Sequence, residues 1–213
     1  MKVLLTAFEP FNGGTINPSQ MVLERVKESS GMELLKVLLP VEFRQTSEKV
    51  KQLLKEHHPD VVISLGQAGN RPEICVERVA VNLDCVRSSD GLRELADNAG
   101  DRPVDVPIEK DGETAYFSTL PVWKLVGAIK EQGVMGAVSY SAGTYVCNHV
   151  MYTVLYEAIK HYPEMKAGFI HVPFLPEQME GRSSGFAMEL DDMVKGIQAV
   201  LDQLQYEEEH CNG

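Results

Sequence analysis

The stretch SYSAGTYVCNHV, residues 139–150, contains two side chains that together could carry out nucleophilic hydrolysis. A cysteine thiolate is a nucleophile, and a histidine within hydrogen-bond distance can act as its base. Cys147 and His149 lie two positions apart in a predicted helix, and residues with that spacing do not face each other. At about 100° per residue, His149 lies about 200° from Cys147, on the outer face of the helix. We therefore expect His149 to be a surface or supporting histidine and not the base.

Cys147 lies in the first turn of this predicted helix and on its buried stripe, within about 60° of Val150 and Met151. The unpaired N–H groups and the dipole at a helix start favour a thiolate, and the same N–H groups can hold an oxyanion. The alternative is that Cys147 is a small buried apolar residue, as free cysteines often are. The helix alone does not decide between the two.

A reactive Cys147 requires a base from another part of the fold, and His171 is the candidate. It lies in GFIHVPF, near the end of an apolar strand one strand–helix unit after the cysteine. The base in turn needs an acceptor that orients it. Glu77 opens the run ERVAVNL, where a strand would place it on the same face as Val79 and Val81. A carboxylate on an apolar face needs a partner, which is either His171 or an ordinary lysine or arginine. His171 could equally be a hydrogen-bonded core histidine.

The elements that must position these residues alternate along the chain. The runs that predict strands are residues 2–8, 34–41, 60–66, 77–83, 134–140 and 166–174. The runs that predict helices are residues 17–29, with Asn17 as the cap, and 44–58, 121–133, 145–162 and 187–205. This alternation predicts an α/β fold, a single domain over residues 1–213, built as an α/β/α sandwich around a mostly parallel twisted sheet.

Ligands of such sheets bind beyond the carboxyl ends of the strands. The segments expected there mix glycine, aromatic and neutral polar residues: TAFEPFNGG, SLGQAGNR, SYSAGTYVC and HVPFLPEQ. Residues 84–114 are polar and rich in Asp and Gly, with weak periodicity. We interpret them as a long functional loop or as an excursion with a little structure of its own.

The composition limits the partners and the compartment. A formal net charge of -11 argues against an extended nucleic-acid surface. No apolar run reaches the roughly 20 residues that span a bilayer, and the first residues lack a signal-peptide cleavage site, so we expect a cytoplasmic protein. The four cysteines have neither CxxC nor metal spacing, which predicts no disulfide framework. Cys211 is expected to be an exposed thiol near the chain end, with an intersubunit disulfide as the alternative.

Four segments resemble the pyroglutamyl peptidase type I family, also called pyrrolidone carboxyl peptidases: TAFEPFNGGTINPS, SLGQAGNRPEICVERVAVN, SAGTYVCNH and GFIHVPFLPEQ. The resemblance implies a cytosolic homotetramer of single-domain α/β/α subunits that removes 5-oxoproline from blocked peptide N-termini without metal or organic cofactor. It also implies a Glu–Cys–His triad, and matching the motifs residue by residue gives Glu77, Cys147 and His171. These are the same three residues that their chemistry makes candidates.

The resemblance further implies a lactam pocket formed by Phe8, Phe11, Asn17, Gln67, Arg87, Tyr145 and Val146. Phe8 and Phe11 would be aromatic walls for a flat neutral ring. Gln67 and Asn17 would be the polar contributors, and Arg87 would lie near the oxyanion site.

The sequence departs from the family pattern in three places. The family usually has Gly where Ala7 stands and Phe where Tyr145 stands. The segment RSSDGLREL after Arg87 is longer than the pattern implies and lacks the apolar residue that often follows that arginine. The sequence therefore does not decide which apolar residue lines this side of the pocket, nor whether Arg87 points toward it.

Two other function classes fit parts of the sequence. A glutamine-amidotransferase-like hydrolase also uses Cys, His and Glu, but its cysteine occupies a GxCxG elbow, and TYVCNHV lacks both glycines. A non-catalytic flavodoxin-like or nucleotide-binding module could use FNGG as a phosphate loop. The surrounding EPFNGGTINPS offers no lysine for that role.

Overall fold

The computed structural model describes residues 1–69, 71–87, 95–182 and 184–211. Strands alternate with helices along most of the described chain, except between residues 61 and 117, where the described elements are four strands. The strands are β1 (Lys2–Phe8), β2 (Glu33–Leu39), β3 (Val61–Gln67), β4 (Ile74–Glu77), β5 (Val79–Val81), β6 (Ala115–Phe117), β7 (Gly136–Ser139) and β8 (Lys166–Val172). The helices are α1 (Pro18–Arg25), α2 (Phe43–His57), α3 (Val122–Glu131), α4 (Val146–His161), the short 3-10 helix η1 (Pro176–Met179) and α5 (Leu190–Cys211).

The main sheet has the strand order β2-β1-β3-β8-β4-β7. Neighbours pair in parallel except at β4, which is antiparallel to β8 and parallel to β7. The predicted mostly parallel sheet is thus confirmed. Since β7 runs against β1, β3 and β8, its carboxyl end does not join theirs, and residues 140–145 lead the chain from β7 to the start of α4.

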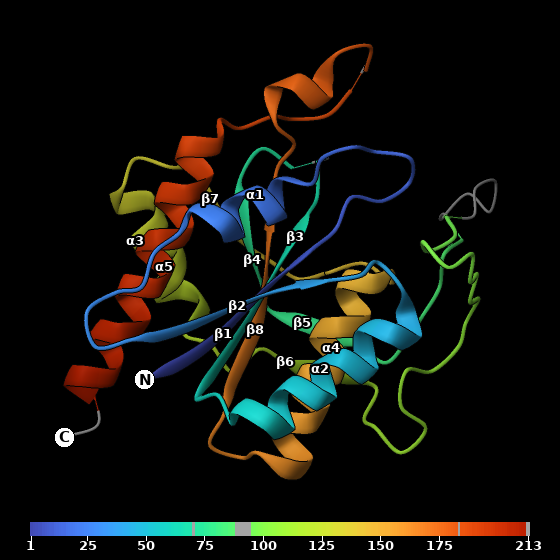
Figure 1. Ribbon diagram of the computed structural model, residues 1–213, viewed down its shortest axis with the longest axis horizontal. Coiled ribbons are helices and arrows are strands. Elements are labelled where there is room, and N and C mark those ends of the chain that lie inside the picture. Colours follow the sequence, from blue (N-terminus) through green and yellow to red (C-terminus); the bar gives the residue numbers. More distant parts are fainter. Residues whose placement is uncertain (70, 88–94, 183, 212–213) are drawn as a thin grey trace.

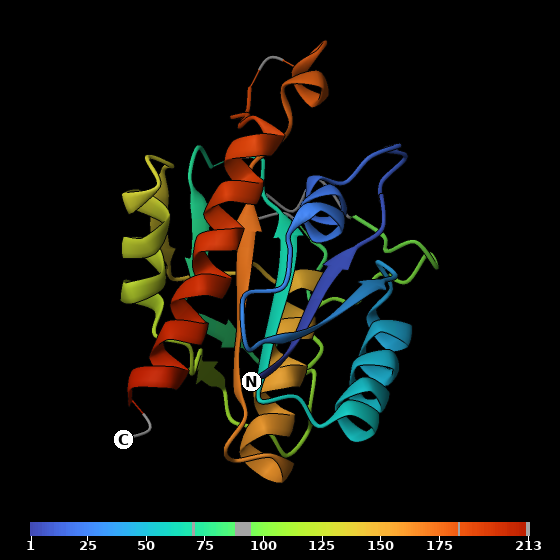
Figure 2. The same cartoon turned by 60° about the vertical axis from the view of Figure 1, so that its left-hand side comes forward.

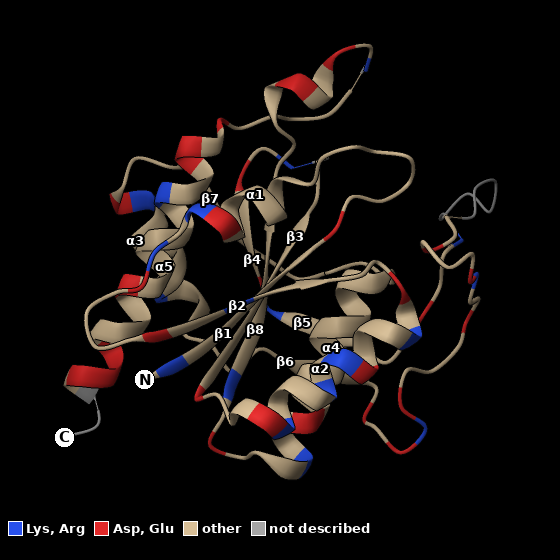
Figure 3. Cartoon of the chain, in the orientation of Figure 1, with Lys and Arg blue, Asp and Glu red and all other residues tan. Residues whose placement is uncertain are grey.

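Helices cover both faces of the sheet. α1, α3 and α5 pack on one face, whereas α2 and α4 pack on the other (Figures 1 and 2). β1 shows why the strand sequences are apolar throughout: Val3 and Leu5 face the first layer, and Leu4 and Phe8 face the second. Charged side chains lie mainly on helices and loops outside this core (Figure 3). The predicted α/β/α sandwich is confirmed.

The predicted strand 77–83 is wrong as one element. Glu77 ends β4 in the main sheet, and β5, which begins at Val79, pairs with β6 in a separate two-stranded sheet. Arg78 lies at the switch, where its N–H donates to Ser139 and its carbonyl accepts from Ser118. A period-2 pattern continues across such a switch because it records alternation and not the sheet to which each residue belongs.

The long loop after β5 matches its prediction in the part that is described. From residue 82 to 114, the described residues form no helix and no strand beyond isolated bridges, such as the one between Asp84 and Val106. Residues 88–94, which include most of the unusual segment after Arg87, lie outside the described part of the chain. None of the described helices has the length and apolar composition that crossing a membrane requires.

Asn17 caps α1, as its position before Pro18 predicts. Its Oδ1 accepts hydrogen bonds from the Ser19 N–H at 3.0 Å and from the Ser19 hydroxyl at 2.8 Å. Its Nδ2 donates to the Glu9 carbonyl at 3.0 Å, and the side chain is buried. Asn17 therefore ties the short helix α1 to the segment that leaves β1.

Asn17→Ala is expected to lower the free energy of unfolding by about 1–2 kcal/mol, because it removes a buried cap. Urea unfolding measures this change. Gln20→Ala on the same helix is the control, since the Gln20 amide bonds only to Glu24 near the surface. Equal effects of the two substitutions would contradict a capping role.

Candidate active site

A buried hydrogen bond joins β4 to β8. The Nδ1 atom of His171 lies 2.7 Å from Oε1 of Glu77, and the two residues are 4% and 0% exposed. A neutral imidazole that donates from Nδ1 keeps Nε2 as its acceptor. Glu77 therefore orients His171 so that Nε2 is the nitrogen left for a second partner.

Cys147 is the second residue of α4, and its sulfur lies over Gly66 of β3. A Cβ atom built on Gly66 would come within 3.0 Å of the Cys147 Sγ and 2.7 Å of the Phe169 ring. Gly66 is the register partner of His171 in the parallel β3–β8 pair, and paired strands lie about 4.8 Å apart. The absence of a side chain at Gly66 thus lets the thiol approach the sheet beside His171.

Arg71 is a residue of the site that the sequence reasoning missed. Its guanidinium donates to Oε1 of Glu77 at 2.6 Å, to the Ser139 hydroxyl at 2.9 Å and to the Ser141 carbonyl at 2.7 Å. The two partners considered for Glu77, histidine and a basic residue, are therefore both present. The only signal in the sequence was a lone arginine shortly after a strand that ends in the expected ligand region.

The pKa values of the two acids shift in opposite directions. Burial raises the pKa of Glu77, but the hydrogen bond from His171 and the Arg71 charge outweigh it, so the net pKa is lowered. Burial, with the Glu77 charge, raises the pKa of Cys147 to about 12, although its own backbone hydrogen bond and Arg71 oppose the rise. Near neutral pH the carboxyl is ionised and the thiol keeps its proton, so Cys147 could act as a nucleophile only with a base.

A cavity of about 440 Å³ opens beside these residues. Its walls include Cys147, His171 and six of the seven predicted pocket residues: Phe8, Phe11, Asn17, Gln67, Tyr145 and Val146. The tertiary structure thus brings together residues from positions 8 to 171 of the chain. Its apolar and aromatic lining suits a small neutral ring.

The seventh predicted pocket residue, Arg87, is exposed and is not among the described residues that line the cavity. Its role stays a prediction.

Leu95 supplies an apolar wall that the sequence left open. It lines the cavity, and its N–H donates to the Val86 carbonyl at 3.2 Å. The next residue is bound as well, because the Tyr145 hydroxyl donates to the Ala96 carbonyl at 3.0 Å. Asp97 then accepts the Phe43 N–H at 2.9 Å. The hydroxyl by which Tyr145 differs from the family pattern therefore fixes the loop that carries Leu95.

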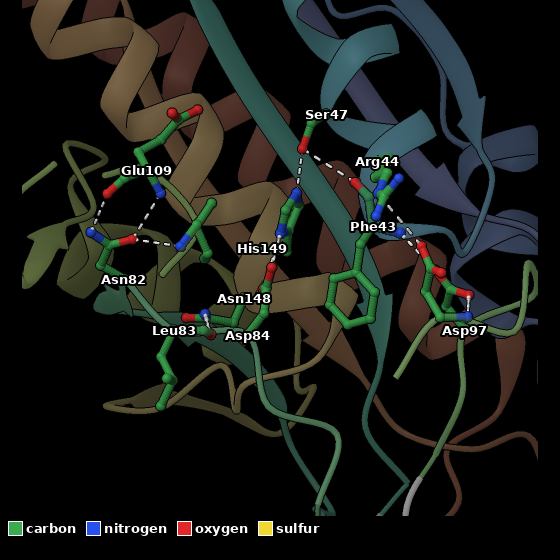
Figure 4. A network of polar contacts seen from close by, with 12 residues as sticks. Phe43, Arg44, Ser47, Asn82, Leu83, Asp84, Asp97, Glu109, Asn148 and His149 are labelled. Atoms are coloured by element: carbon green, nitrogen blue, oxygen red, sulfur yellow. Dashed lines mark hydrogen bonds and ion pairs between the residues drawn. The ribbon is translucent and has the colours of Figure 1, made fainter. Parts of the chain in front are cut away.

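The expectation that His149 lies on an outer face is wrong. It is 7% exposed, and its ring nitrogens contact Asp84 and Ser47 (Figure 4). α4 is buried on nearly all sides, from Asn148 to Tyr156, so a helical-wheel angle could not identify an outer face. The expectation that His149 is not paired with Cys147 agrees with these contacts.

Among the described residues, no group of three His, Cys, Asp or Glu side chains lies close enough to hold a metal ion. The described cysteines whose side chains are placed, Cys75, Cys85 and Cys147, are free thiols. The side chain of Cys211 lies outside the described residues.

Arg71→Met is expected to lower kcat/KM about 10- to 100-fold, because a hydrogen bond to a charged group contributes about 1.5–3 kcal/mol. Loss of the Arg71 charge also raises the pKa of Glu77, so the acid limb of the pH–rate profile should move to higher pH. Arg71→Lys keeps the charge but not the planar guanidinium, so its kcat/KM should lie between those of the wild type and Arg71→Met.

Arg25→Met, which removes a surface ion pair with Asp191, is the control. A folded Arg71→Met with a wild-type rate and acid limb would contradict this role.

Comparisons with known proteins show the family to which the chain belongs. A family model described as pyroglutamyl peptidase matches residues 1–206. The pyrrolidone-carboxylate peptidase 1 of Caldanaerobacter subterraneus subsp. tengcongensis is 46% identical over 202 residues, which are 94% of this chain and 96% of the relative. The pyrrolidone-carboxylate peptidase of Clostridium perfringens is 43% identical, over 94% of this chain and 92% of its own.

Solved structures agree as well. The crystal structure of Bacillus amyloliquefaciens pyroglutamyl peptidase I superposes with a TM-score of 0.87 at 38% identity and covers 94% of each chain. A mutant pyrrolidone carboxyl peptidase from the hyperthermophile Pyrococcus furiosus gives a TM-score of 0.90 at 33% identity, over 98% of this chain and 100% of the other. The chain therefore belongs to the pyroglutamyl peptidase family of cysteine-type hydrolases.

Proposed function

We propose that the protein hydrolyses the bond after an N-terminal pyroglutamyl residue, with Cys147 as nucleophile, His171 as base and acid, and Glu77 as the orienting carboxylate. The observation that carries this proposal is the buried Glu77–His171 pair next to a thiol at the wall of an aromatic-lined cavity. Membership of the pyroglutamyl peptidase family supports the same substrate class.

In the first step, the Cys147 thiol proton passes to Nε2 of His171 while the sulfur attacks the substrate. The sulfur forms a bond to the carbonyl carbon of the 5-oxoproline residue, and the carbonyl oxygen becomes an oxyanion. The raised pKa of Cys147 supports transfer during the attack rather than a thiolate at rest. Glu77 stabilises the imidazolium that forms.

The oxyanion lies near the start of α4. Tyr145, the N-cap residue, makes no side-chain cap hydrogen bond, so the first-turn N–H groups of Val146 and Cys147 are not covered by it. Collapse of the oxyanion breaks the amide bond, and His171 gives its proton to the leaving amine. Water then attacks the thioester and gives a proton to His171. The C–S bond breaks, His171 returns that proton to the sulfur, and free 5-oxoproline and the Cys147 thiol are released.

Phe8, Phe11 and Tyr145 favour a flat ring without charge. The rings of Phe11 and Tyr145 lie 6.2 Å apart, and Phe8 packs on Phe169 at the same centroid distance. A blocked N-terminus has no ammonium group, so the cavity needs no carboxylate to receive one. Specificity must then come from polar groups that pair with the lactam N–H and C=O.

The hydrogen bonds of Gln67 indicate which group it offers. The Leu175 N–H can only donate, and it donates to Oε1 of Gln178 at 2.9 Å. The Nε2 of Gln178 therefore donates to Oε1 of Gln67, also at 2.9 Å. This leaves the Gln67 amide nitrogen as a donor for the lactam carbonyl. Asn17, whose Oδ1 already accepts two hydrogen bonds, also has a donor to spare.

The first test is release of a fluorescent amine from pyroglutamyl, prolyl and glutaminyl amides. We expect turnover of the pyroglutamyl amide alone, and no turnover by Cys147→Ala. Cys85→Ala is the matched control, because Cys85 is a free thiol outside the cavity wall. A folded, reduced wild type without pyroglutamyl turnover would refute the proposed function, and full activity of Cys147→Ala would refute its nucleophile.

Gln67→Leu is expected to narrow the preference for pyroglutamyl over prolyl substrates. An unpaired buried polar group costs about 1–3 kcal/mol, which is about 5- to 160-fold in the ratio of kcat/KM values. The measurement is that ratio in the wild type, in Gln67→Leu and in Gln52→Leu, a control on the exposed side of α2. An unchanged ratio would exclude Gln67 from lactam recognition.

A homo-oligomer, a cytoplasmic location and the state of Cys211 are further proposals that come from the sequence. Large exposed apolar side chains such as Phe117, Trp123 and Tyr140 support a protein partner, which for a homotetramer is another copy of the chain. Non-reducing gels of the wild type against Cys211→Ser test the intersubunit disulfide.

A further inference from the structure

The first turn of α4 is held by polar side chains that immediately follow the nucleophile. The Oδ1 of Asn148 accepts the Val81 N–H at 2.9 Å, and its Nδ2 donates to the Val81 and Leu83 carbonyls at 2.9 and 3.1 Å. This buried side chain therefore fastens the turn to the end of β5 (Figure 4). The contact lies one residue after Cys147.

His149 fastens the same turn to two further segments. Its Nδ1 lies 3.0 and 2.8 Å from the two carboxylate oxygens of Asp84, in the loop after β5. Its Nε2 contacts the Ser47 hydroxyl, which in turn donates to the Phe43 carbonyl at 3.2 Å. Figure 4 shows the row from Asp84 through His149 to Ser47. One buried imidazole thus joins α4, α2 and the loop.

Phe43 connects this row to the substrate cavity. Its ring meets the His149 ring edge-on at 5.4 Å and the Tyr145 ring edge-on at 5.6 Å. Tyr145 is both the N-cap of α4 and a wall of the cavity. A change at His149 can therefore reach the helix start and the cavity through direct contacts.

We propose that His149, with Asp84 and Ser47, is a positioning device that sets the first turn of α4 and so aims the Cys147 thiol at the substrate carbonyl. It touches neither the substrate nor the reacting atoms. A misplacement of about 1 Å can cost about 100-fold in rate. The inference rests on the proposed function, because it assigns these residues to the same nucleophile.

The row also has the residue types of a serine hydrolase triad, but the contacts favour positioning. The Ser47 hydroxyl is bound to a carbonyl of its own helix, and Ser47 is not among the described residues that line the neighbouring cavity of about 340 Å³. A nucleophile would need to face such a cavity. A role of Ser47 as a nucleophile is the alternative that the experiments below must exclude.

The decisive variant is His149→Leu, with His161→Leu on the same helix as the matched control. His161 lies in the last turn of α4, and its side chain is 59% exposed. We expect kcat of His149→Leu to fall about 10- to 100-fold while KM stays within about threefold, because the cavity remains and the thiol is misaimed. The inhibition constant of 2-pyrrolidone, the lactam ring alone, should likewise stay within about threefold.

A conservative pair keeps the test valid if His149→Leu does not fold. Asp84→Asn retains an acceptor for Nδ1 and should keep kcat within about threefold, whereas Asp84→Ala should lose at least about tenfold. If Asp84→Asn were as damaging as Asp84→Ala, the charge and not the hydrogen bond would matter, and positioning would be refuted. A folded His149→Leu with wild-type kcat would refute it as well.

A readout without substrate separates this inference from the proposed function. The rate at which iodoacetamide alkylates Cys147, followed by mass spectrometry, should fall at least about threefold in His149→Leu and stay unchanged in His161→Leu. That result would support positioning even if no pyroglutamyl amide were turned over, and an unchanged rate would overturn it. Ester hydrolysis that survives in Cys147→Ala and disappears on adding Ser47→Ala would show a serine nucleophile and overturn it too.

Discussion

The buried carboxylate of Glu77 is the constraint on which the rest of the site depends. A fully desolvated charge is stable only when it is paired and hydrogen-bonded. His171 and Arg71 provide the pairing from two different segments of the chain. Because β4 runs antiparallel to β8, the carboxylate reaches the imidazole across a strand pair, and the ring is left with one orientation and one available nitrogen.

The proposed nucleophile, Cys147, is placed by a second constraint, which is the close approach of α4 to the sheet. Gly66 leaves room for the Cys147 sulfur where any other residue would place a Cβ atom. The burial that results raises the pKa of the thiol, so the same contact that brings Cys147 near His171 also makes it depend on that base. Asn148 and His149 bind the same turn to the β5 end, to the loop after it and to α2. The start of α4 is therefore packed against the sheet and also held in one orientation.

The cavity follows from the way its walls are assembled. Phe8 and Gln67 end two parallel strands, whereas Leu95 comes from the long loop after β5. The loop keeps its position through Tyr145 and Asp97, which bind its backbone to α4 and α2. Leu95 thus provides the apolar wall that was expected from a residue directly after Arg87.

The sequence by itself determined the fold class, most of the elements and the chemistry of the site. Apolar runs separated by amphipathic helices led to the sandwich, and residue type together with the family resemblance selected Glu77, Cys147 and His171. The predictions of the fold class and of the Asn17 cap succeeded because strand periodicity and helix capping are local properties, whereas the catalytic roles of the three residues stay predictions.

The tertiary structure alone decided which distant groups meet. Arg71 became a partner of Glu77 because a turn folds back on β4, and nothing in its local sequence marks that contact. The prediction that His149 lies on an outer face was wrong because a helical wheel assumes that one face of the helix meets solvent. α4 is instead covered by the sheet, by α2 and by the loop after β5. The switch of sheets after Glu77 and the wall at Leu95 were equally invisible. Burial and long-range pairing depend on what the rest of the chain places nearby, and that is decided only when the chain folds.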